Sequence, residues 1–236
     1  MDIQLALHHL RHFFAPHQCG ICQRPLMDTE NLICSSCSTC IQSSHHQDYT
    51  QSTIARLFWG TAPIIRGGIL FHYQSEAPVS NILVNIKYRK HADTSLNMGR
   101  VMGCYFQTQQ FFEGIDCIVP VPLSKERYQY RGYNQSEEIA KGISEVTQID
   151  VDATSIIRIQ DNRTQTHLTS AERMKNVEGI FQVKHPEQLD GKHILIVDDI
   201  ITTGATINSL IRTISDVAPK SVFSVVALGR GGDVRI

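Results

Sequence analysis

Two adjacent carboxylates, followed by a glycine among hydroxyl side chains, are the residues of this sequence best suited to hold a ligand. They lie in Ile194–Thr206, where an apolar run leads to Asp198 and Asp199 and then to the loop Thr202–Thr206. Carboxylates only accept hydrogen bonds, so they suit sugar hydroxyls or a hydrated Mg²⁺ ion. The loop offers hydroxyl and backbone N–H donors, which suit a phosphate. A sugar phosphate would satisfy both halves at once.

The elements around these residues are expected to place them at a ligand-binding edge. Four consecutive apolar residues before Asp198 predict a strand buried on both faces, as in a parallel sheet covered by helices. A helix is predicted directly after Gly204, and ligands of such sheets bind beyond the carboxyl ends of the strands. The alternative is an ordinary strand followed by a helix that Thr203 caps. A Walker-type loop is excluded, because no Gly-Lys-Thr or Gly-Lys-Ser triplet occurs.

This stretch resembles the signature with which type I phosphoribosyltransferases bind 5-phosphoribosyl-1-pyrophosphate (PRPP). The resemblance implies that Asp198 and Asp199 hold the ribose hydroxyls and belong to the catalytic residues. It also implies that Mg²⁺ accompanies PRPP and touches the protein mainly through water. The residues expected to hold the 5-phosphate are Thr202, Thr203, Gly204, Ala205 and Thr206.

A second buried strand, predicted over Cys117–Val121, ends where these enzymes have their pyrophosphate loop. The resemblance implies that the backbone at Val121 and Pro122, with Lys125 and Arg127 nearby, receives the leaving pyrophosphate. The polar, cationic segment 160–176 is expected to close over the ligand and to deliver a further catalytic residue, Arg173. Its alternative interpretation is a surface loop whose cations face solvent.

Five of the seven cysteines crowd into residues 19–40, which favours a metal site over disulfides. Cys19 and Cys22 form one Cys-x-x-Cys turn, and Cys34 and Cys37 form a second, eleven residues later. Two such turns predict a closed Cys₄ site for a structural Zn²⁺. Cys40 and His17 are spare donors, and either is an alternative fourth ligand. The other two cysteines, Cys104 and Cys117, are expected to be small core residues.

The fold class expected is α/β, a mostly parallel, doubly wound sheet of the type I phosphoribosyltransferase type, with a small zinc ribbon at the N-terminal side. We expect an amphipathic helix over 1–16, the zinc ribbon over 17–41, a linker over 42–60 with little fixed structure over 42–58, and the phosphoribosyltransferase-like domain over 61–236. Within the domain, the pattern predicts a pair of strands over 64–73, helices over 79–90, 95–109 and 134–147, and strands over 154–159, 177–183 and 222–228. Gly67 and Gly68 are expected to mark a bulge or a close approach.

The composition is that of a globular protein, with 42% hydrophobic and 19% charged residues among 236 and a formal net charge of −1. This charge argues against a protein coated in positive potential, though not against a local basic groove. No apolar run approaches the ~18 residues of a membrane helix, and the first residues do not resemble an export signal. We therefore expect no membrane insertion and a cytoplasmic location.

The motifs also occur in the order found in the ComF/GntX family, to which competence proteins of the ComFC type belong. The ordered set comprises the Cys₄ knuckle, the strand pair over 64–73, Ile86-Lys87-Tyr88, Val119-Pro120-Val121-Pro122, Arg131-Gly132-Tyr133-Asn134-Gln135, Arg163-Thr164-Gln165 with Leu168, Arg173 and Asn176, and the Asp198-Asp199 loop. The chain is thus similar to proteins in which a zinc ribbon precedes a type I phosphoribosyltransferase domain. The resemblance implies a link to DNA uptake in naturally transformable bacteria.

Three functions remain open from the sequence. The first is transfer of phosphoribosyl from PRPP to an unknown acceptor. Hypoxanthine-type relatives carry an aspartate as general base at the position where this chain has Thr202. Adenine- and orotate-type enzymes lack this aspartate too, so its absence does not exclude activity. The resemblance therefore identifies the donor and leaves the acceptor unidentified.

The second function is non-catalytic binding of single-stranded DNA, with the PRPP site acting as a ligand sensor. Cations contact phosphates and tyrosines stack on bases. The alternative is that the tyrosines are core residues and the cations a solvated face. The residues considered are Lys87, Arg89, Lys90, Lys125, Arg127 and Arg131, interleaved with Tyr88, Tyr128, Tyr130 and Tyr133. The third function is a scaffold, in which the zinc ribbon docks a competence helicase or another uptake protein.

Overall fold

The structure is a computed structural model that describes residues 19, 24–27, 30, 33–38, 48–72, 92–159 and 179–231. Several predicted features lie outside these residues, so their structure is not described. They are the helix over 1–16, the helix over 79–90, the segment 160–176, and the residues His17, Cys22, Cys40, Lys87, Arg89 and Arg173.

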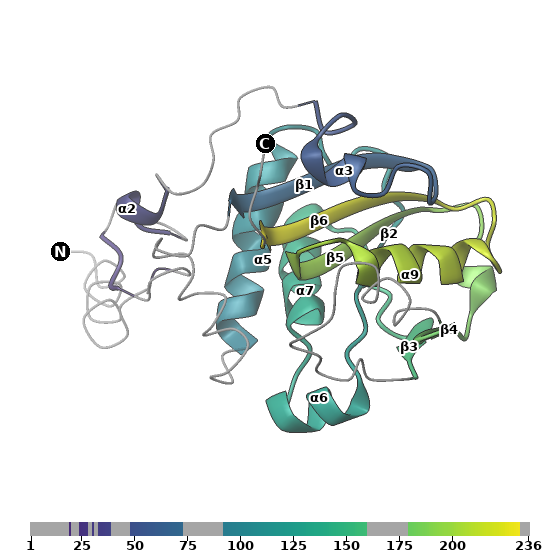
Figure 1. Ribbon diagram of the computed structural model, residues 1–236. Helices are drawn as coiled ribbons and strands as arrows, with labels where there is room; N and C mark the ends of the chain where they lie inside the picture. Colours follow the sequence, from purple (N-terminus) through teal and green to yellow (C-terminus); the bar gives the residue numbers. More distant parts are fainter. Residues whose placement is uncertain are drawn as a thin grey trace.

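Four parallel strands form the central sheet (Figure 1). Their order is β1 (Ile64–His72), β6 (Val222–Arg230), β5 (His193–Ile201) and β2 (Cys117–Pro120). β5 pairs with β6 on one side and with β2 on the other. The strand that carries the two aspartates is therefore interior, and the predicted parallel sheet is confirmed.

Helices cover both faces of this sheet (Figure 1). α5 (Ala92–Gln107) and α7 (Gln135–Thr147) pack on one face. α3 (Thr53–Arg56) and α9 (Ala205–Ser215) pack on the other. This arrangement confirms the expected doubly wound α/β architecture.

The apolar run of β5 supplies both hydrophobic cores. Successive side chains of a strand point to opposite faces. Leu195 and Val197 belong to the buried cluster that contains residues of α5 and α7. Ile194 and Ile196 belong to the cluster that contains residues of α9. A continuous apolar run is therefore needed here, because both faces of the strand are covered.

Two glycines let α5 and α7 approach closely. A Cβ atom on Gly142 would lie 2.1 Å from the carbonyl oxygen of Leu96, and one on Gly99 would lie 2.1 Å from that of Ile139. The two helices run in the same direction, since Gly103 meets Val146 one turn further along. Both helices therefore begin at the same edge of the sheet.

Smaller elements lie outside the sheet. β3 (Ile156–Arg158) and β4 (Phe181–Val183) form an antiparallel pair. α6 (Lys125–Arg131) follows β2 and has no buried residue. The remaining short helices are α2 (Ser35–Ser38) and a 3₁₀ turn over Pro186–Gln188.

The predicted pair of strands over 64–73 is wrong, because β1 is a single strand that pairs with β6. A bulge or a close approach was expected at Gly67 and Gly68, and the structure shows a close approach. A Cβ atom on Gly67 would lie 2.4 Å from the backbone nitrogen of Ala55, and one on Gly68 would lie 2.8 Å from the Phe106 ring. The glycines thus reflect long-range packing rather than a turn.

The expectation of little fixed structure does not describe residues 48–58. Ile54 and Phe58 are fully buried, and Tyr49 packs edge-on against Phe106 and Phe111. The backbone of this segment also covers the outer edge of the sheet at β1, where the Gly67 N–H donates to the Tyr49 carbonyl at 2.9 Å.

The opposite edge of the sheet is covered too. The N–H of Ile118 in β2 donates to the carbonyl of Asp150 at 2.9 Å, and the N–H of Asp152 donates to the carbonyl of Ile118 at 2.8 Å. Residues 150–152 thus satisfy the outward-facing backbone groups of Ile118.

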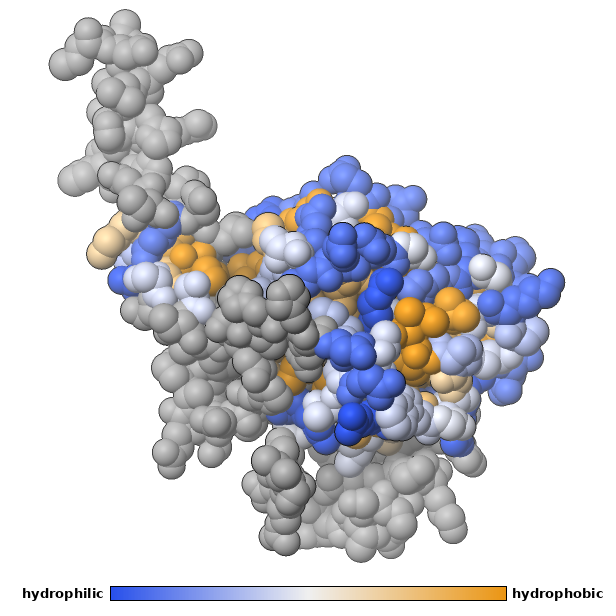
Figure 2. Space-filling model, turned by 90° about the horizontal axis from the view of Figure 1, so that it is seen from above, coloured by the Kyte–Doolittle hydropathy of each residue, from blue (hydrophilic) through white to orange (hydrophobic). Residues whose placement is uncertain are grey.

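The described surface is largely polar. Figure 2 shows a face on which hydrophilic residues predominate and hydrophobic ones gather only in small patches. Within the ranges described above, no helix is long and apolar enough to cross a membrane.

Candidate functional site

The two aspartates lie near the carboxyl end of β5 in different surroundings. Asp199 is 9% exposed, and Asp198 is half-buried. Asp198 Oδ1 accepts two hydrogen bonds, from Ser136 Oγ at 3.0 Å and from the Asp199 N–H at 2.8 Å. Asp199 Oδ1 accepts the N–H of Ile200 at 2.7 Å. Both carboxylates are therefore held in defined orientations next to the predicted phosphate loop.

The predicted phosphate loop, Thr202–Thr206, leads into a helix N-terminus that has no side-chain cap. Gly204 is the N-cap of α9 in a left-handed conformation with φ +75°, and no acidic residue occupies the first turn. Thr202 and Thr203 are exposed, and Ala205 and Thr206 are half-buried. Thr203 Oγ1 accepts only the N–H of Ala205, at 3.4 Å, so Thr203 is not the N-cap of the helix. Such an N-terminus suits an anion.

Residues that precede β1 pack against this loop and bond to the helix that follows it. The ring of Phe58 fills the space where a Cβ on Gly204 would lie. Asn208 Nδ2, one turn into α9, donates to the Leu57 carbonyl at 3.5 Å. Phe58 stands in a polar stretch, and its contact with a loop almost 150 residues away has no signal in the sequence.

The end of β2, where the pyrophosphate loop is expected, lies beside β5. The Val121 N–H donates to the Val197 carbonyl at 2.9 Å, which places Val121 directly next to the residue before Asp198. Val121 is buried, and Pro122 is half-buried. Beyond them, α6 carries an exposed Lys125 and a half-buried Arg127.

The start of α7 completes the edge. Asn134 caps the helix by accepting the Ser136 N–H at 3.2 Å, and its Nδ2 donates to the Val121 carbonyl at 3.1 Å. Arg131 donates to Gln135 Oε1 at 2.9 Å, while the buried Nε2 of Gln135 has no partner in the structure. The helix start at Asn134 was predicted, but the contact of Ser136 with Asp198 was not.

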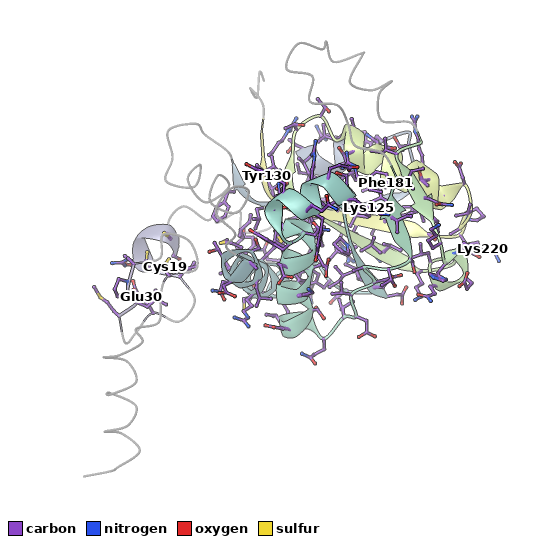
Figure 3. The ribbon with its side chains drawn as sticks, turned by 90° about the horizontal axis from the view of Figure 1, so that it is seen from below. Cys19, Glu30, Lys125, Tyr130, Phe181 and Lys220 are labelled. Atoms are coloured by element: carbon purple, nitrogen blue, oxygen red, sulfur yellow. The ribbon has the colours of Figure 1, made fainter. Side chains whose placement is uncertain are left out.

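The tyrosines near α6 divide into two groups. Tyr133 is only 9% exposed, and burial raises the pKa of its hydroxyl. Its expected role of stacking on a base is therefore corrected, since its ring does not face solvent. Tyr128 and Tyr130 are 51% and 74% exposed, and Figure 3 shows Tyr130 and Lys125 on this outlying helix.

Three of the four predicted zinc ligands come together. The Sγ atoms of Cys19, Cys34 and Cys37 all lie within 4.8 Å of one another, and all three residues are buried. The N–H of Cys34 donates to Cys19 Sγ at 3.3 Å, and that of Cys37 donates to Cys34 Sγ at 3.4 Å. Burial opposes ionisation of Cys34, but hydrogen bonds from Arg24 and from the Cys37 backbone lower the pKa of this thiol to about 6. The donor set fits a metal such as Zn²⁺.

An ion pair missed in the sequence braces this cluster. Arg24 Nη2 donates to Glu30 Oε1 at 2.9 Å, and Glu30 also accepts the N–H groups of Met27 and Ser35, at 3.0 and 2.6 Å. These backbone hydrogen bonds, from Met27 first, lower the pKa of Glu30 below its ordinary value. Figure 3 shows Cys19 and Glu30 at the same end of the molecule.

The two remaining cysteines differ from each other. Cys117 is buried in β2, and burial raises the pKa of its thiol to about 11, as suits a core residue. Cys104 is exposed on α5, so the expectation of a core position was wrong for it.

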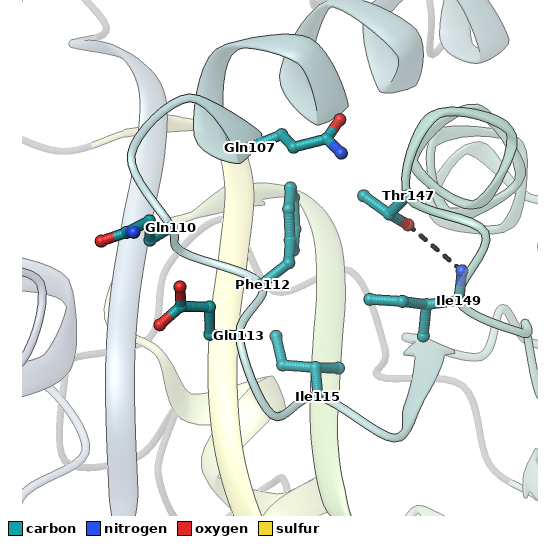
Figure 4. A pocket seen from close by; sticks show the side chains of 7 residues that line it. All are labelled: Gln107, Gln110, Phe112, Glu113, Ile115, Thr147 and Ile149. Carbon is teal, nitrogen blue, oxygen red and sulfur yellow. Dashed lines mark hydrogen bonds between the residues drawn. The ribbon is translucent and has the colours of Figure 1, made fainter.

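A cavity of about 300 Å³ lies between the C-terminal ends of α5 and α7, at the end of the sheet opposite to the two aspartates (Figure 4). Thr147 donates there to the Ile143 carbonyl at 2.9 Å and accepts the Ile149 N–H at 3.4 Å. None of the described lining side chains leaves a buried polar atom without a partner. The lining residues are Gln107, Gln110, Phe112, Glu113, Ile115, Thr147 and Ile149.

Comparisons with known proteins agree with this architecture. The phosphoribosyl transferase domain family matches residues 130–235, which include β5, α9 and β6. The DNA utilization protein YhgH of Escherichia coli (strain K12) is 27% identical over 203 residues, which are 81% of this chain and 88% of that protein. The competence protein ComFC of Bacillus subtilis (strain 168) is 35% identical over 95 residues, 40% of this chain and 36% of that one.

Among solved structures, glutamine PRPP amidotransferase from B. subtilis matches with a TM-score of 0.41 and 18% identity. The match covers 61% of this chain, which spans only 30% of the length of that protein. The chain thus contains a domain that matches the phosphoribosyl transferase domain family. It is similar over most of its length to a DNA utilization protein and over a shorter stretch to a competence protein of the ComFC type.

Proposed function

We propose that the chain binds PRPP with Mg²⁺ at the carboxyl edge of its sheet and transfers the phosphoribosyl group to an acceptor. One observation carries this proposal: β5 delivers two oriented carboxylates, and five residues after Asp199 the chain reaches Gly204, the N-cap of a helix N-terminus without a side-chain cap. The carboxylates suit the ribose hydroxyls and the helix start suits the 5-phosphate. Both ends of a sugar phosphate are thereby matched on one short segment.

The chemistry would use the neighbouring end of β2. Displacement at the anomeric carbon passes through an oxocarbenium-like state, so the departing pyrophosphate must be stabilised. The backbone at Val121 and Pro122 lies next to β5, and the cations Lys125 and Arg127 follow on α6. Mg²⁺ would neutralise charge on the pyrophosphate. Arg173, expected to close over the ligand, stays a prediction.

The acceptor is not identified by the described residues. Thr202, at the start of the phosphate loop, is exposed and cannot act as the carboxylate base of hypoxanthine-type relatives. The names of the relatives, DNA utilization protein and competence protein, support a role in DNA uptake. We propose that role for this chain, at the cytoplasmic location expected for the family.

Calorimetric titration with PRPP and Mg²⁺ tests the proposal. Wild-type protein is expected to bind PRPP, whereas the double variant Asp198→Asn, Asp199→Asn is expected to lose binding without losing its fold. Asp216→Asn removes an exposed carboxylate at the other end of α9 and is the matched control. Release of pyrophosphate with candidate acceptors, DNA ends included, then tests transfer. A wild-type protein indifferent to PRPP would overturn the proposal.

A second candidate function is binding of single-stranded DNA, which α6 favours. This helix has no buried residue, yet it carries two exposed tyrosines, Tyr128 and Tyr130. Cations precede and follow them, at Lys125, Arg127 and Arg131. An exposed aromatic and cationic helix next to a phosphate site suits a nucleic acid strand. In this case PRPP would act as a sensed ligand rather than as a substrate.

A further inference from the structure

Two residues at the start of α7, Asn134 and Ser136, connect the two strand ends that form the proposed site. Asn134 Nδ2 donates to the Val121 carbonyl at 3.1 Å, which ties the helix to the end of β2. Ser136 Oγ donates to Asp198 Oδ1 at 3.0 Å, which ties it to β5. The Val121 N–H donates to the Val197 carbonyl and closes the ring. These hydrogen bonds, together with the backbone between Val197 and Asp198, join the proposed pyrophosphate side of the site to its proposed ribose side.

The geometry at Asp198 shows what Ser136 does. Ser136 Oγ and the Asp199 N–H both donate to Oδ1 of this carboxylate. These two donors restrain the rotation of the Asp198 carboxylate and hold its Oδ1 between the start of α7 and the backbone of β5. Ser136 is itself held, because its N–H donates to the cap residue Asn134 and its side chain is 5% exposed.

We propose that Ser136 is a positioning residue for Asp198, the proposed ribose-binding residue. Asn134 fixes the position of Ser136 relative to the end of β2, because it bonds to both the Val121 carbonyl and the Ser136 N–H. This inference rests on the proposed binding of PRPP. It assigns a role in the site to the segment 134–136, which lies outside both the acidic pair and the phosphate loop. A hydrogen bond to a charged group stabilises the bound arrangement by enough to change affinity severalfold to a hundredfold.

The alternative is that the Ser136 hydroxyl only stabilises the fold. The two roles differ in ligand selectivity, because a carboxylate that holds ribose hydroxyls does not touch the pyrophosphate. Ser136→Ala should therefore weaken binding of PRPP and of ribose 5-phosphate while leaving magnesium pyrophosphate unaffected. A general loss of structure would weaken all three ligands together.

The experiment is calorimetric titration of PRPP with Mg²⁺, ribose 5-phosphate, and magnesium pyrophosphate into wild type, Ser136→Ala and Thr147→Ala. Thr147→Ala is the matched control, since it removes a hydroxyl hydrogen bond from the other end of α7. Ser136→Ala is expected to bind PRPP and ribose 5-phosphate about tenfold more weakly, with magnesium pyrophosphate unchanged and Thr147→Ala like wild type.

Thermal melting of each variant checks the fold. Unchanged PRPP affinity in Ser136→Ala, or an equal loss for ribose 5-phosphate and magnesium pyrophosphate, overturns the positioning role while the proposed function stands. If wild type binds none of the three ligands, the proposed function fails and the positioning role fails with it.

Discussion

Phe58 packs so tightly against Gly204 that a Cβ atom on this glycine would lie 2.9 Å from Phe58 Cε1. Gly204 also has φ +75°, a conformation that other residues adopt only with strain. Gly204→Ala is therefore expected to lose ~1–2 kcal/mol of unfolding free energy through backbone strain, and more through the clash. Urea denaturation measures the loss, and PRPP titration measures the effect on the phosphate loop.

Gly191→Ala is the matched control for this prediction. Gly191 has φ +76°, but a Cβ atom there would meet nothing within 4 Å. It should show the strain alone, so the difference between the two variants reports the contact with Phe58. Equal losses in both variants would show that the ring does not constrain the loop.

Gly142→Ala is expected to destabilise the protein by forcing α5 and α7 apart. The new Cβ would lie 2.1 Å from the Leu96 carbonyl oxygen, which belongs to the backbone and cannot rotate away. The penalty of ~1–3 kcal/mol for overpacking outweighs the ~1 kcal/mol by which alanine favours a helix. Gly103→Ala faces only the side chain of Val146, so its loss in urea denaturation should be smaller. A stable Gly142→Ala would contradict this account of the helix crossing.

The cysteine cluster is expected to hold one Zn²⁺ per chain, measurable by elemental analysis. Cys37→Ser should lower the metal content and speed its loss to a chelator, because the site is built from buried thiols that lie within 4.8 Å of one another. Cys104→Ser, at an exposed cysteine on α5, serves as the control and should keep the metal. Full retention of zinc by Cys37→Ser would remove Cys37 from the ligand set.

Tyr128→Ala and Tyr130→Ala are expected to weaken binding of an oligothymidine strand. Each lost stacking contact is worth ~1–3 kcal/mol per base, and binding should fall steeply with salt. Fluorescence anisotropy of a labelled strand measures both effects. Trp59→Ala replaces another exposed aromatic residue away from α6 and should bind like wild type. No detectable binding by wild type at low salt would sink this candidate function.

Stability should decline as the pH falls below about 6.5 because of His193. Burial lowers the pKa of this histidine from 6.5, and Arg66 lowers it further, although Gly114 and Asp116 act in the opposite direction. The unfolded state then binds a proton more readily than the folded state. The stability that His193 contributes is complete above the unfolded pKa and is lost as the pH falls through the folded one.

Urea denaturation at pH 7.5 and at pH 5.5 tests this. In the wild type the imidazole bridges the Gly114 carbonyl at 3.0 Å and Ser224 Oγ at 2.8 Å. His193→Gln should be less stable at pH 7.5 but less sensitive to pH. His185→Gln replaces an exposed histidine and is the matched control. An unchanged pH dependence in His193→Gln would contradict the assignment.

The parts of the fold that sequence reasoning predicted depend on local signals. The apolar run before Asp198 requires a strand with two covered faces, and the helix after Gly204 follows from the chemistry of its loop. Asn134 marks the start of α7 because its side chain caps the helix. These signals span a few residues each, so a single sequence displays them.

The missed parts depend on contacts between distant segments. The sequence indicated a bulge or a close approach at Gly67, but not that Ala55 is the residue packed against it, and Tyr49 and Phe58 become core residues only when β1 and α9 are in place. The contact of Ser136 with Asp198 could not be predicted either, since the two residues are 62 apart in the sequence. A serine near the start of a helix is usually explained by capping of that helix, so it does not indicate a contact with a distant strand.

The covered borders of the sheet bear on how this protein can associate. Exposed strand borders readily recruit a strand from another chain, and such pairing is a common route to aggregation. Here the Gly67 N–H donates to the Tyr49 carbonyl on one border. On the other border the Ile118 N–H donates to the Asp150 carbonyl, and the Ile118 carbonyl accepts the Asp152 N–H. At these positions the backbone groups that a strand from another chain would need are already hydrogen-bonded within this chain. A macromolecule that binds this chain is therefore expected to recognise its loops, its outlying helix or its cysteine cluster, and to leave the sheet unextended.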